Sequence, residues 1–406
     1  MSWPRIKLRE LITLTGGHAF KSGDFEAIGI PLIRIGTANS GTFKTSEFVF
    51  LPQEYKFKYS KYLVNPGDLL ITLTGTVGKG DYGNVCEATD GYDSYLLNQR
   101  VAKININSID LSKRYLYLFL ATPEVKKNLT SLSRGVRQAN IKNEDILDLE
   151  IPLPPLDEQK RIAAILDKAD AIRRKRQQAI KLTDDFLRSV FLDMFGDPIS
   201  NPKEWEVKKL KEISSKISSG NTPKGGSKNY VDEGITFMRS QNVWKNKLLL
   251  DDVVYIDEKT HESMSKSSLK RKDILMTKTG RINTENSSLG RAALYLGEDG
   301  KANLNGHVYF IRLVENILHE FVVFILTTIE YRDYIRSVCV GGIDKRQLNK
   351  NHLEEFPIIY PPKKMQEQFV KKVNVASNML EKAKSGLKES EQMFNGLSQK
   401  AFSGEL

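Results

Sequence analysis

Several short stretches of the sequence combine residue types that could carry catalysis. GGHAFKS (16–22) and GTVGK (75–79) contain the glycines and lysine of a phosphate-binding loop. Such a loop needs the spacing G-x-x-x-x-G-K-[ST], because its backbone amides surround a phosphate group. Phe20 stands where the first stretch needs its second glycine, and the glycines of the second stretch lie too close together. Both stretches are therefore interpreted as turns.

The acidic, histidine and serine residues also lack a catalytic arrangement. Asp257, Glu258 and Lys259 fit the short acid-x-Lys element of many nucleases, but a solvated charge run explains them better. The histidines show no metal-ligand spacing: His18, His261, His307, His319 and His352. Neither a G-x-S-x-G motif nor the Asn-Pro-Pro-aromatic or Asp-Pro-Pro-aromatic element of adenine methyltransferases occurs. The sequence thus predicts no catalytic and no metal-binding residue in this chain.

Polar and cationic residues in pairs of equivalent loops indicate DNA binding instead. Arg and Lys suit guanine and phosphate, whereas Asn and Gln suit adenine. Three sets are candidates: Arg34, Thr37 and Asn39 with Arg239, Gln241 and Asn242; Thr74, Thr76 and Lys79 with Lys278, Thr279 and Arg281; Arg134, Arg137, Gln138 and Asn140 with Lys345, Arg346, Gln347 and Asn349. The net charge of +11 and the pI near 9.3 favour a polyanionic partner. Ordinary surface loops have similar residues, so that alternative stays open.

These loops are related by an internal repeat. GDLLITLTG (67–75) returns as KDILMTKTG (272–280), and Pro154-Pro155 returns as Pro361-Pro362. Since the period is about 205 residues, the repeat is a duplication of domains rather than a solenoid. Short alternating strand patterns separated by Gly and Asn, with a few helical stretches between them, predict an α+β fold for each copy.

A long helical pattern follows each globular copy. Apolar or small residues recur every three or four positions from Ile162 to Val190, and again from Phe369 to Ala401. Asp157 is the expected N-cap of the first helix. Two helices with such stripes bury them by pairing, and two-fold symmetry makes the pair antiparallel. About 39 residues give a helix of roughly 58 Å. The basic block Arg173–Arg176 either follows a DNA backbone or is a solvated helix face.

The predicted organisation therefore has four parts. A globular domain over residues 1–155 is followed by a long helix over 156–197, a second globular domain over 198–363 and a second long helix over 364–406. The two domains are expected to be related by a pseudo-two-fold axis and separated by an antiparallel coiled coil.

Cysteine usage and apolar segments bear on the compartment. Cys86 and Cys339 cannot form a disulfide framework, which favours a reducing cytoplasm. No run of 18 apolar residues predicts a membrane span, and the N-terminus lacks the apolar core of a secretion signal. We expect a cytoplasmic protein without a membrane partner.

Taken together, the sequence motifs of this chain resemble those of the specificity subunit of type I restriction-modification systems. PLPPLDEQKRIAAILDKAD (152–170), FGDP (195–198) and AFSGEL (401–406) are typical of that family, and the resemblance covers essentially the whole chain. It implies two target-recognition domains that bind the halves of a bipartite, asymmetric site in double-stranded DNA. It also implies docking of two methyltransferase subunits and of motor-nuclease restriction subunits. S-adenosylmethionine, ATP and Mg are then cofactors of those partners and not of this chain.

Two alternatives remain open. One is a stand-alone DNA-modifying enzyme with duplicated domains, which would act on DNA without partners. The other is a coiled-coil scaffold without a role in nucleic-acid binding.

Overall fold

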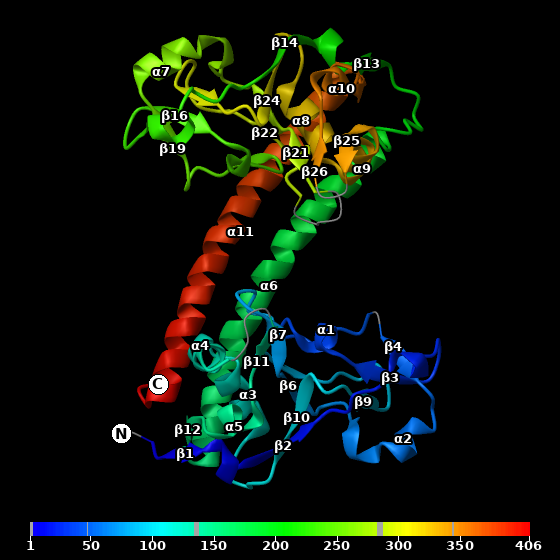
Figure 1. Ribbon diagram of the computed structural model, residues 1–406, viewed down its shortest axis with the longest axis vertical. Helices are drawn as coiled ribbons and strands as arrows, with labels where there is room; N and C mark the ends of the chain where they lie inside the picture. Colours follow the sequence, from blue (N-terminus) through cyan, green and yellow to red (C-terminus); the bar gives the residue numbers. More distant parts are fainter. Residues whose placement is uncertain (1–2, 47, 134–137, 282–286, 343–344) are drawn as a thin grey trace. The chain divides into compact units, whose positions relative to one another are not determined.

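The computed structural model describes residues 3–46, 48–133, 138–281, 287–342 and 345–406. The chain divides into two units (Figure 1): unit 1 comprises Met1–Gln178 and Ala383–Leu406, and unit 2 comprises Ala179–Lys382. Each unit mixes helices with sheets around its own buried core, which confirms the α+β fold class. The domain boundaries at 155, 197 and 363 stay a prediction. Within the described ranges, no helix is both long enough and apolar enough to cross a membrane.

The strands of unit 1 form short antiparallel pairs and two four-stranded sheets, in the orders β2-β10-β6-β8 and β4-β3-β9-β5. The strands are β1 (Arg5–Lys7), β2 (Ile12–Gly16), β3 (Ile30–Ile33), β4 (Val49–Leu51), β5 (Leu63–Val64), β6 (Leu69–Thr72), β7 (Thr74–Thr76), β8 (Val85–Glu87), β9 (Tyr95–Leu97), β10 (Val101–Ile106), β11 (Gln138–Asn140) and β12 (Glu150–Pro152). All four residues of β6 are buried, because this strand is covered on both faces.

Unit 2 repeats the first of these sheets in the order β14-β24-β20-β22 and three strands of the second in the order β15-β19-β16-β23. The outer strand β15 lies beside β19, whereas β5 of unit 1 lies beside β9 at the opposite edge. Its strands are β13 (Val207–Lys209), β14 (Ser214–Ser219), β15 (Tyr230–Val231), β16 (Ile235–Met238), β17 (Val243–Trp244), β18 (Lys247–Leu248), β19 (Val254–Ile256), β20 (Ile274–Thr277), β21 (Thr279–Gly280), β22 (Ala292–Leu294), β23 (Ala302–Leu304), β24 (Val308–Leu313), β25 (Val340–Gly342), β26 (Lys345–Gln347) and β27 (Pro357–Ile359). The central strands β6 and β20 carry the repeated sequence phrases, so the sequence repeat is also a structural repeat.

The short helices also correspond between the units, except that a 3-10 turn over Ser240–Asn242 takes the place of the first one in unit 2. They are α1 (Ile35–Ala38), α2 (Tyr55–Lys58), α3 (Lys113–Leu120), α4 (Pro123–Ser131) and α5 (Asn143–Leu147) in unit 1, and α7 (Glu258–Ser263), α8 (His319–Thr327), α9 (Ile329–Val338) and α10 (Lys350–Glu354) in unit 2. Thr122 caps α4 and Thr328 caps α9, since each hydroxyl accepts a hydrogen bond from the backbone N–H three residues later. Each cap thus begins the second of two consecutive helices, α4 after α3 and α9 after α8.

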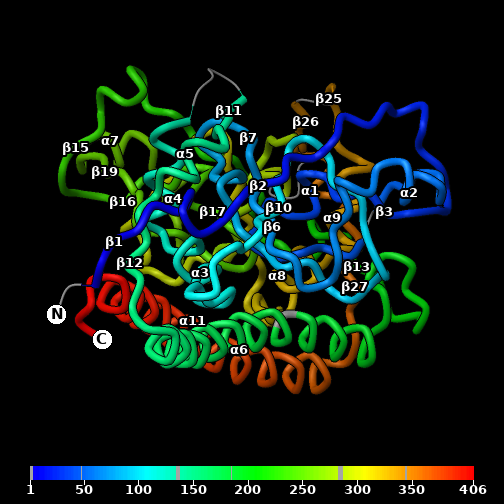
Figure 2. Tube along the Cα trace, turned by 90° about the horizontal axis from the view of Figure 1, so that it is seen from below, coloured from blue at the N-terminus to red at the C-terminus, as the bar shows by residue number. Residues whose placement is uncertain are grey.

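Two long helices, α6 (Leu156–Phe195) and α11 (Lys363–Ser403), each contribute residues to both units. In unit 1 they run antiparallel (Figures 1 and 2). Arg161 donates to the carbonyl oxygen of Leu406, whereas Arg176, further along α6, donates to that of Gly386. In unit 2, Phe191 of α6 packs against Phe369 of α11, with ring centroids 5.4 Å apart.

The glutamine of the repeated Pro-Pro turn fixes the start of each long helix. Gln159 is fully buried; its Nε2 donates to the carbonyl oxygens of Pro154 (2.8 Å) and Asp110 (2.7 Å), and its Oε1 accepts from the N–H of Ser112 (2.8 Å). Gln366 Nε2 donates in the same way to the carbonyl oxygen of Pro361 (2.7 Å). The expected cap, Asp157, lies instead inside the first helical turn. The repeated phrase is therefore a buried hydrogen-bonded joint.

The predicted apolar stripe of α6 is buried only toward its two ends. Ile162 and Leu166 enter the core of unit 1, and Leu187 and Phe191 enter that of unit 2. Between them Ile172 and Phe186, both predicted to be in the stripe, are 43% and 56% exposed. Here the prediction was wrong, because a regular spacing does not say where the partner helix comes close.

Candidate nucleic-acid interface

A two-stranded ladder in unit 1 brings together candidate residues from distant parts of the chain. In the antiparallel pair of β7 and β11, Thr76 lies opposite Gln138 and Thr74 lies opposite Asn140. Thr76, Gln138 and Asn140 are exposed, whereas the Thr74 hydroxyl is buried without a hydrogen-bond partner. The N–H of Ile141 extends the ladder by donating to the carbonyl oxygen of Leu73 (2.8 Å). The pairing thus creates a polar ribbon with hydrogen-bonding side chains on both strands.

Asn84 joins this ribbon to the candidate residues around α1. Its Nδ2 donates to the carbonyl oxygens of Asn39 (2.5 Å) and Gly80 (3.3 Å). Lys126 of α4 donates to Asn84 Oδ1 (2.5 Å) and to the same Gly80 carbonyl (2.7 Å). The loop that carries the exposed Lys79 is thereby tied to α1 on one side and to α4 on the other.

The two remaining candidates of this set are Arg34, which directly precedes α1, and Thr37 within α1. Thr37 Oγ1 accepts a hydrogen bond from the backbone N–H of Arg34 (3.3 Å), so this hydroxyl shapes the turn. The Arg34 side chain is exposed. Arg134 and Arg137 lie outside the described residues.

Unit 2 builds the same ribbon with three strands. Thr279 of β21 lies opposite Gln347 of β26, and β25 pairs with the other edge of β26. The exposed candidates of this ribbon are Arg281, Lys345, Gln347 and Asn349. Gln347 Nε2 donates to Asn349 Oδ1 (3.3 Å), which aligns two amide side chains at its edge.

Two cations of this ribbon are partly withdrawn from water. Lys278 Nζ lies 4.4 Å from the ring centroid of Tyr309, and burial lowers the pKa of this lysine. Arg346 donates through Nη1 to the carbonyl oxygen of Cys339 (3.0 Å), while its buried Nε has no hydrogen-bond partner. Water screens such charges less, so an approaching phosphate interacts with them more strongly than with freely solvated lysines.

The candidates Arg239, Gln241 and Asn242 of unit 2 form hydrogen bonds within their own loop. Arg239 donates to Asp252 Oδ1 (3.1 Å), Gln241 donates to Asp252 Oδ2 (2.6 Å), and Asn242 Nδ2 donates to the Asp252 carbonyl oxygen (2.9 Å). Asn242 is only 1% exposed and stiffens the loop. A base contact by Arg239 or Gln241 requires that side chain to leave Asp252.

Asn84 in unit 1 and Arg291 in unit 2 are not among the candidates predicted from the sequence, yet they occupy the same place in their units. Thr72 Oγ1 accepts from the N–H of Asn84 (3.0 Å), and Thr277 Oγ1 accepts from the N–H of Arg291 (2.9 Å), so Asn84 and Arg291 are equivalent. The Arg291 guanidinium lies 3.9 Å from the ring centroid of Trp244.

The partner of Asn84 also has an equivalent. Lys126 follows its cap Thr122 by the same spacing that separates Arg332 from Thr328. Arg332 is 7% exposed and its Nη1 has no hydrogen-bond partner. Its pKa is lowered by burial and then by the charge of Arg336. The shared signal was a threonine with a cationic residue four positions later, in TPEVK (122–126) and TIEYR (328–332).

The arginines of the basic block of α6 form contacts within α6 and with α11. Arg173 and Arg174 pair with Asp170 at 2.5 and 2.6 Å, and Arg173 also lies over the ring of Phe394 in α11 (5.1 Å). Arg176 donates to the Gly386 carbonyl oxygen. These arginines are thus held by intramolecular contacts within unit 1.

A known protein family matches this chain. The family described as type I restriction modification DNA specificity domain matches the chain twice, over residues 2–182 and 202–388. The two matched segments correspond to the two copies of the repeat.

Individual relatives cover the chain to different extents. The MjaVIII specificity subunit of Methanocaldococcus jannaschii is 30% identical over 44% of this chain and 43% of its own length. The EcoBI specificity subunit of Escherichia coli is 25% identical over 69% of this chain and 61% of its own length. The chain thus spans less than two thirds of either relative. The StySPI specificity subunit of Salmonella potsdam is 22% identical over 100% of this chain and 89% of its own length.

Solved structures share the fold. The type I restriction-modification S subunit from M. genitalium has a TM-score of 0.57 and 16% identity, covering 99% of this chain and 96% of that one. A chain from a structure of a type I R-M system has a TM-score of 0.55 and 17% identity, covering 100% and 98%.

Proposed function

Because the chain belongs to the type I restriction modification DNA specificity family, we propose that it selects the DNA sequence on which a type I restriction-modification complex acts. The observation that carries the proposal is the repeated polar ribbon. Each unit has a strand pair with amide side chains, β7 with β11 and β21 with β26, beside a helix that bears a cation, Lys126 or Arg332. In unit 2 the strand β26 adds the cations Lys345 and Arg346. Amides and cations supply the donors and acceptors with which proteins contact base edges and phosphates.

The two ribbons read different halves of a bipartite, asymmetric site. Their side chains differ at equivalent places: Thr74 is paired with Asn140 and Gly75 with Ala139 in unit 1, whereas Thr279 is paired with Gln347 and Gly280 with Arg346 in unit 2. A different set of donors and acceptors favours a different set of bases. Purified complex with and without this chain, assayed by sequencing of methylated adenines, tests the proposal: modification at one defined sequence should require the chain.

The chain itself is non-catalytic and docks two methyltransferase subunits and motor-nuclease subunits. S-adenosylmethionine, ATP and Mg are bound by those partners. Exposed apolar side chains on the long helices support the docking: Leu182, Phe186, Val375 and Met379 of unit 2 are each more than half exposed. Apolar surface of this kind marks protein–protein contacts. Methyl transfer by the isolated chain would refute this division of labour.

A further inference from the structure

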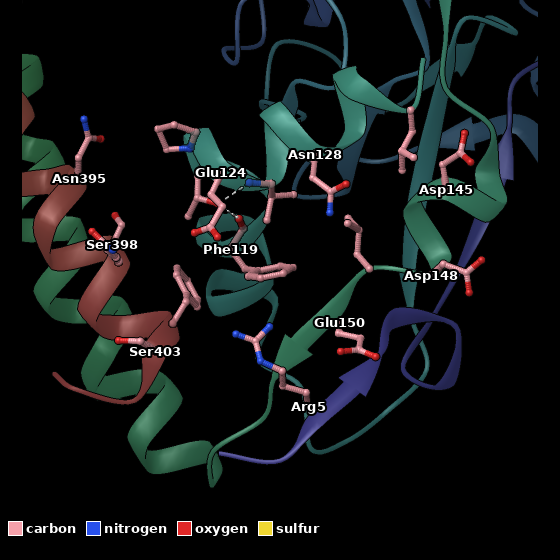
Figure 3. Close-up of a pocket in the computed structure, with 17 residues that line it drawn as sticks. Arg5, Phe119, Glu124, Asn128, Asp145, Asp148, Glu150, Asn395, Ser398 and Ser403 are labelled. Carbon is pink, nitrogen blue, oxygen red and sulfur yellow. Dashed lines mark hydrogen bonds between the residues drawn. The ribbon is translucent and has the colours of Figure 1, made fainter. Parts of the chain in front are cut away.

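A polar groove of about 990 Å³ lies in unit 1 between α4, α5 and the C-terminal turns of α11 (Figure 3). Its lining includes Glu124 of α4, Glu150 of β12 and, from α11, Asn395, Ser398 and Phe402. Unit 2 is the second copy of the repeat, and there the side chains of this chain itself fill the equivalent place.

The two units can be aligned through one aromatic anchor. Phe402 of α11 packs against Tyr115 of α3, with ring centroids 5.3 Å apart. Phe195 of α6 packs against Phe321 of α8 at 5.1 Å. Since α3 and α8 are equivalent, the end of α11 in unit 1 occupies the place of the end of α6 in unit 2.

In unit 2 this place is closed by an ion pair. Arg188 of α6 donates to Glu330 in the first turn of α9. Glu124 occupies the same position in α4, two residues after its threonine cap. Asn395 precedes Phe402 by the seven residues that separate Arg188 from Phe195. Unit 1 thus keeps the carboxylate of the pair but has an amide in place of the guanidinium.

The apolar filling is also absent from unit 1. Phe191, four residues before Phe195, is fully buried in unit 2 and packs against Phe324 with ring centroids 5.2 Å apart. Ser398, four residues before Phe402, takes its place in α11. Ser398 is 3% exposed, and its Oγ has no hydrogen-bond partner. A short polar side chain in the place of a phenyl ring leaves space.

The groove has an excess of negative charge. Glu124 and Glu150 form no ion pair with any described residue, and Arg5 is the one cationic residue in the lining. Asp148 is already paired with Lys7 (3.4 Å) and Arg9 (2.7 Å). Asp145, the fourth carboxylate of the lining, accepts a hydrogen bond from the backbone N–H of Lys142 (2.8 Å). Glu124 and Glu150 are therefore the carboxylates that can receive a cation.

We propose that this groove receives an arginine, adjacent in its chain to a bulky apolar residue, from a methyltransferase partner subunit. The inference rests on the proposed function. The incoming guanidinium pairs with Glu124 as Arg188 pairs with Glu330, and the apolar residue fills the space over Ser398 as Phe191 does in unit 2. Because unit 2 is closed by its own Arg188 and Phe191, it cannot take the same segment at the equivalent place. Two partner subunits are therefore held in non-equivalent ways.

The test measures the affinity of the full chain for the purified methyltransferase subunit of its own system by titration calorimetry. Asn395→Arg supplies the missing guanidinium from this chain itself and should weaken binding of the methyltransferase subunit about tenfold or more. Glu124→Gln removes the carboxylate and should weaken binding to a similar extent. Glu144→Gln is the matched control, because Glu144 holds the same first-turn position in α5 but lies outside the groove. It should change affinity by less than about twofold.

The outcomes separate this inference from the function on which it rests. If both groove variants bind the methyltransferase subunit as tightly as the wild-type chain does, and the complex still methylates its site, the proposed role of the groove is wrong but the proposed function stands. Equal partner affinity with weakened DNA binding would assign the groove to DNA and overturn it too. A wild-type chain that binds no methyltransferase subunit would overturn the proposed function as well. A photo-crosslinking residue at position 395 should capture a partner peptide that contains arginine; capture of peptides without arginine or lysine would contradict the proposal.

Discussion

Lys126 Nζ lies 2.5 Å from Asn84 Oδ1, and this hydrogen bond ties α4 to the loop that presents Lys79. Lys126 is partly withdrawn from water, and its pKa is lowered by burial, an effect that Asp81 partly opposes. Lys126→Met should reduce the slope of log affinity for DNA against log salt concentration by about one, as expected for the loss of one phosphate contact. Lys127→Met, at the exposed neighbouring position, should leave the slope unchanged. Equal slopes for both variants would make Lys126 purely structural.

Replacement of Arg332, the equivalent residue of unit 2, should raise the stability of the protein and weaken its binding to DNA. A buried guanidinium with an unpartnered nitrogen costs stability, so Arg332→Met should raise the free energy of unfolding by about 1 kcal/mol. The same change should weaken DNA binding by the reconstituted complex. Urea unfolding and a DNA titration check the two effects. A variant that is less stable and binds DNA normally would assign Arg332 to the core alone.

Gln159 should be essential to the joint between the first globular part and α6. Gln159→Leu leaves the N–H of Ser112 and two carbonyl oxygens without their partner, which should lower the free energy of unfolding by about 3 kcal/mol. Gln178→Leu, an exposed change in the same helix, is the control and should stay within about 0.5 kcal/mol. Similar losses in both variants would show that the buried bonds are not the cause.

An acidic residue of unit 2 predicts a dependence of stability on pH. Glu355 pairs with Lys209 (2.5 Å) and Lys211 (2.6 Å), and these partners lower its pKa from 4.5 to about 2. The unfolded chain therefore binds more protons in this window, so the contribution to stability is present above pH 4.5 and is lost as the pH falls toward 2. Glu355→Gln should flatten that part of the stability curve, and high salt should weaken the effect because the pair is exposed. An unchanged curve in the variant would refute the assignment.

The long helices predict the spacing between the half-sites. Insertion of four residues near Gln177 lengthens α6 by about 6 Å and turns it by about one helical turn. If α6 sets the spacing, methylation mapping should find the same half-sites with a spacer longer by one or two base pairs, since each pair adds about 3.4 Å. An active complex with an unchanged spacer would mean that the helices do not set it.

The repeat, the α+β class and the two long helices could be predicted from sequence, because each depends on a local pattern that occurs twice. The burial of Asn242 and the exposure of Phe186 could not. Both depend on which distant segment comes close, and a spacing rule contains no such information. Comparison of the two copies residue by residue would have revealed Lys126 with Arg332 and Asn395 with Arg188. The DNA contacts of the candidate residues stay a prediction.

We propose above all that each globular part reads one half of a bipartite DNA site and thereby directs a methyltransferase partner. The most direct measurement replaces residues 1–155 with those of a relative, reconstitutes the complex with its partner subunits, and maps methylated adenines by sequencing. We expect one half of the methylated sequence to change while the other half is retained. A change in both halves, or in neither, would contradict it.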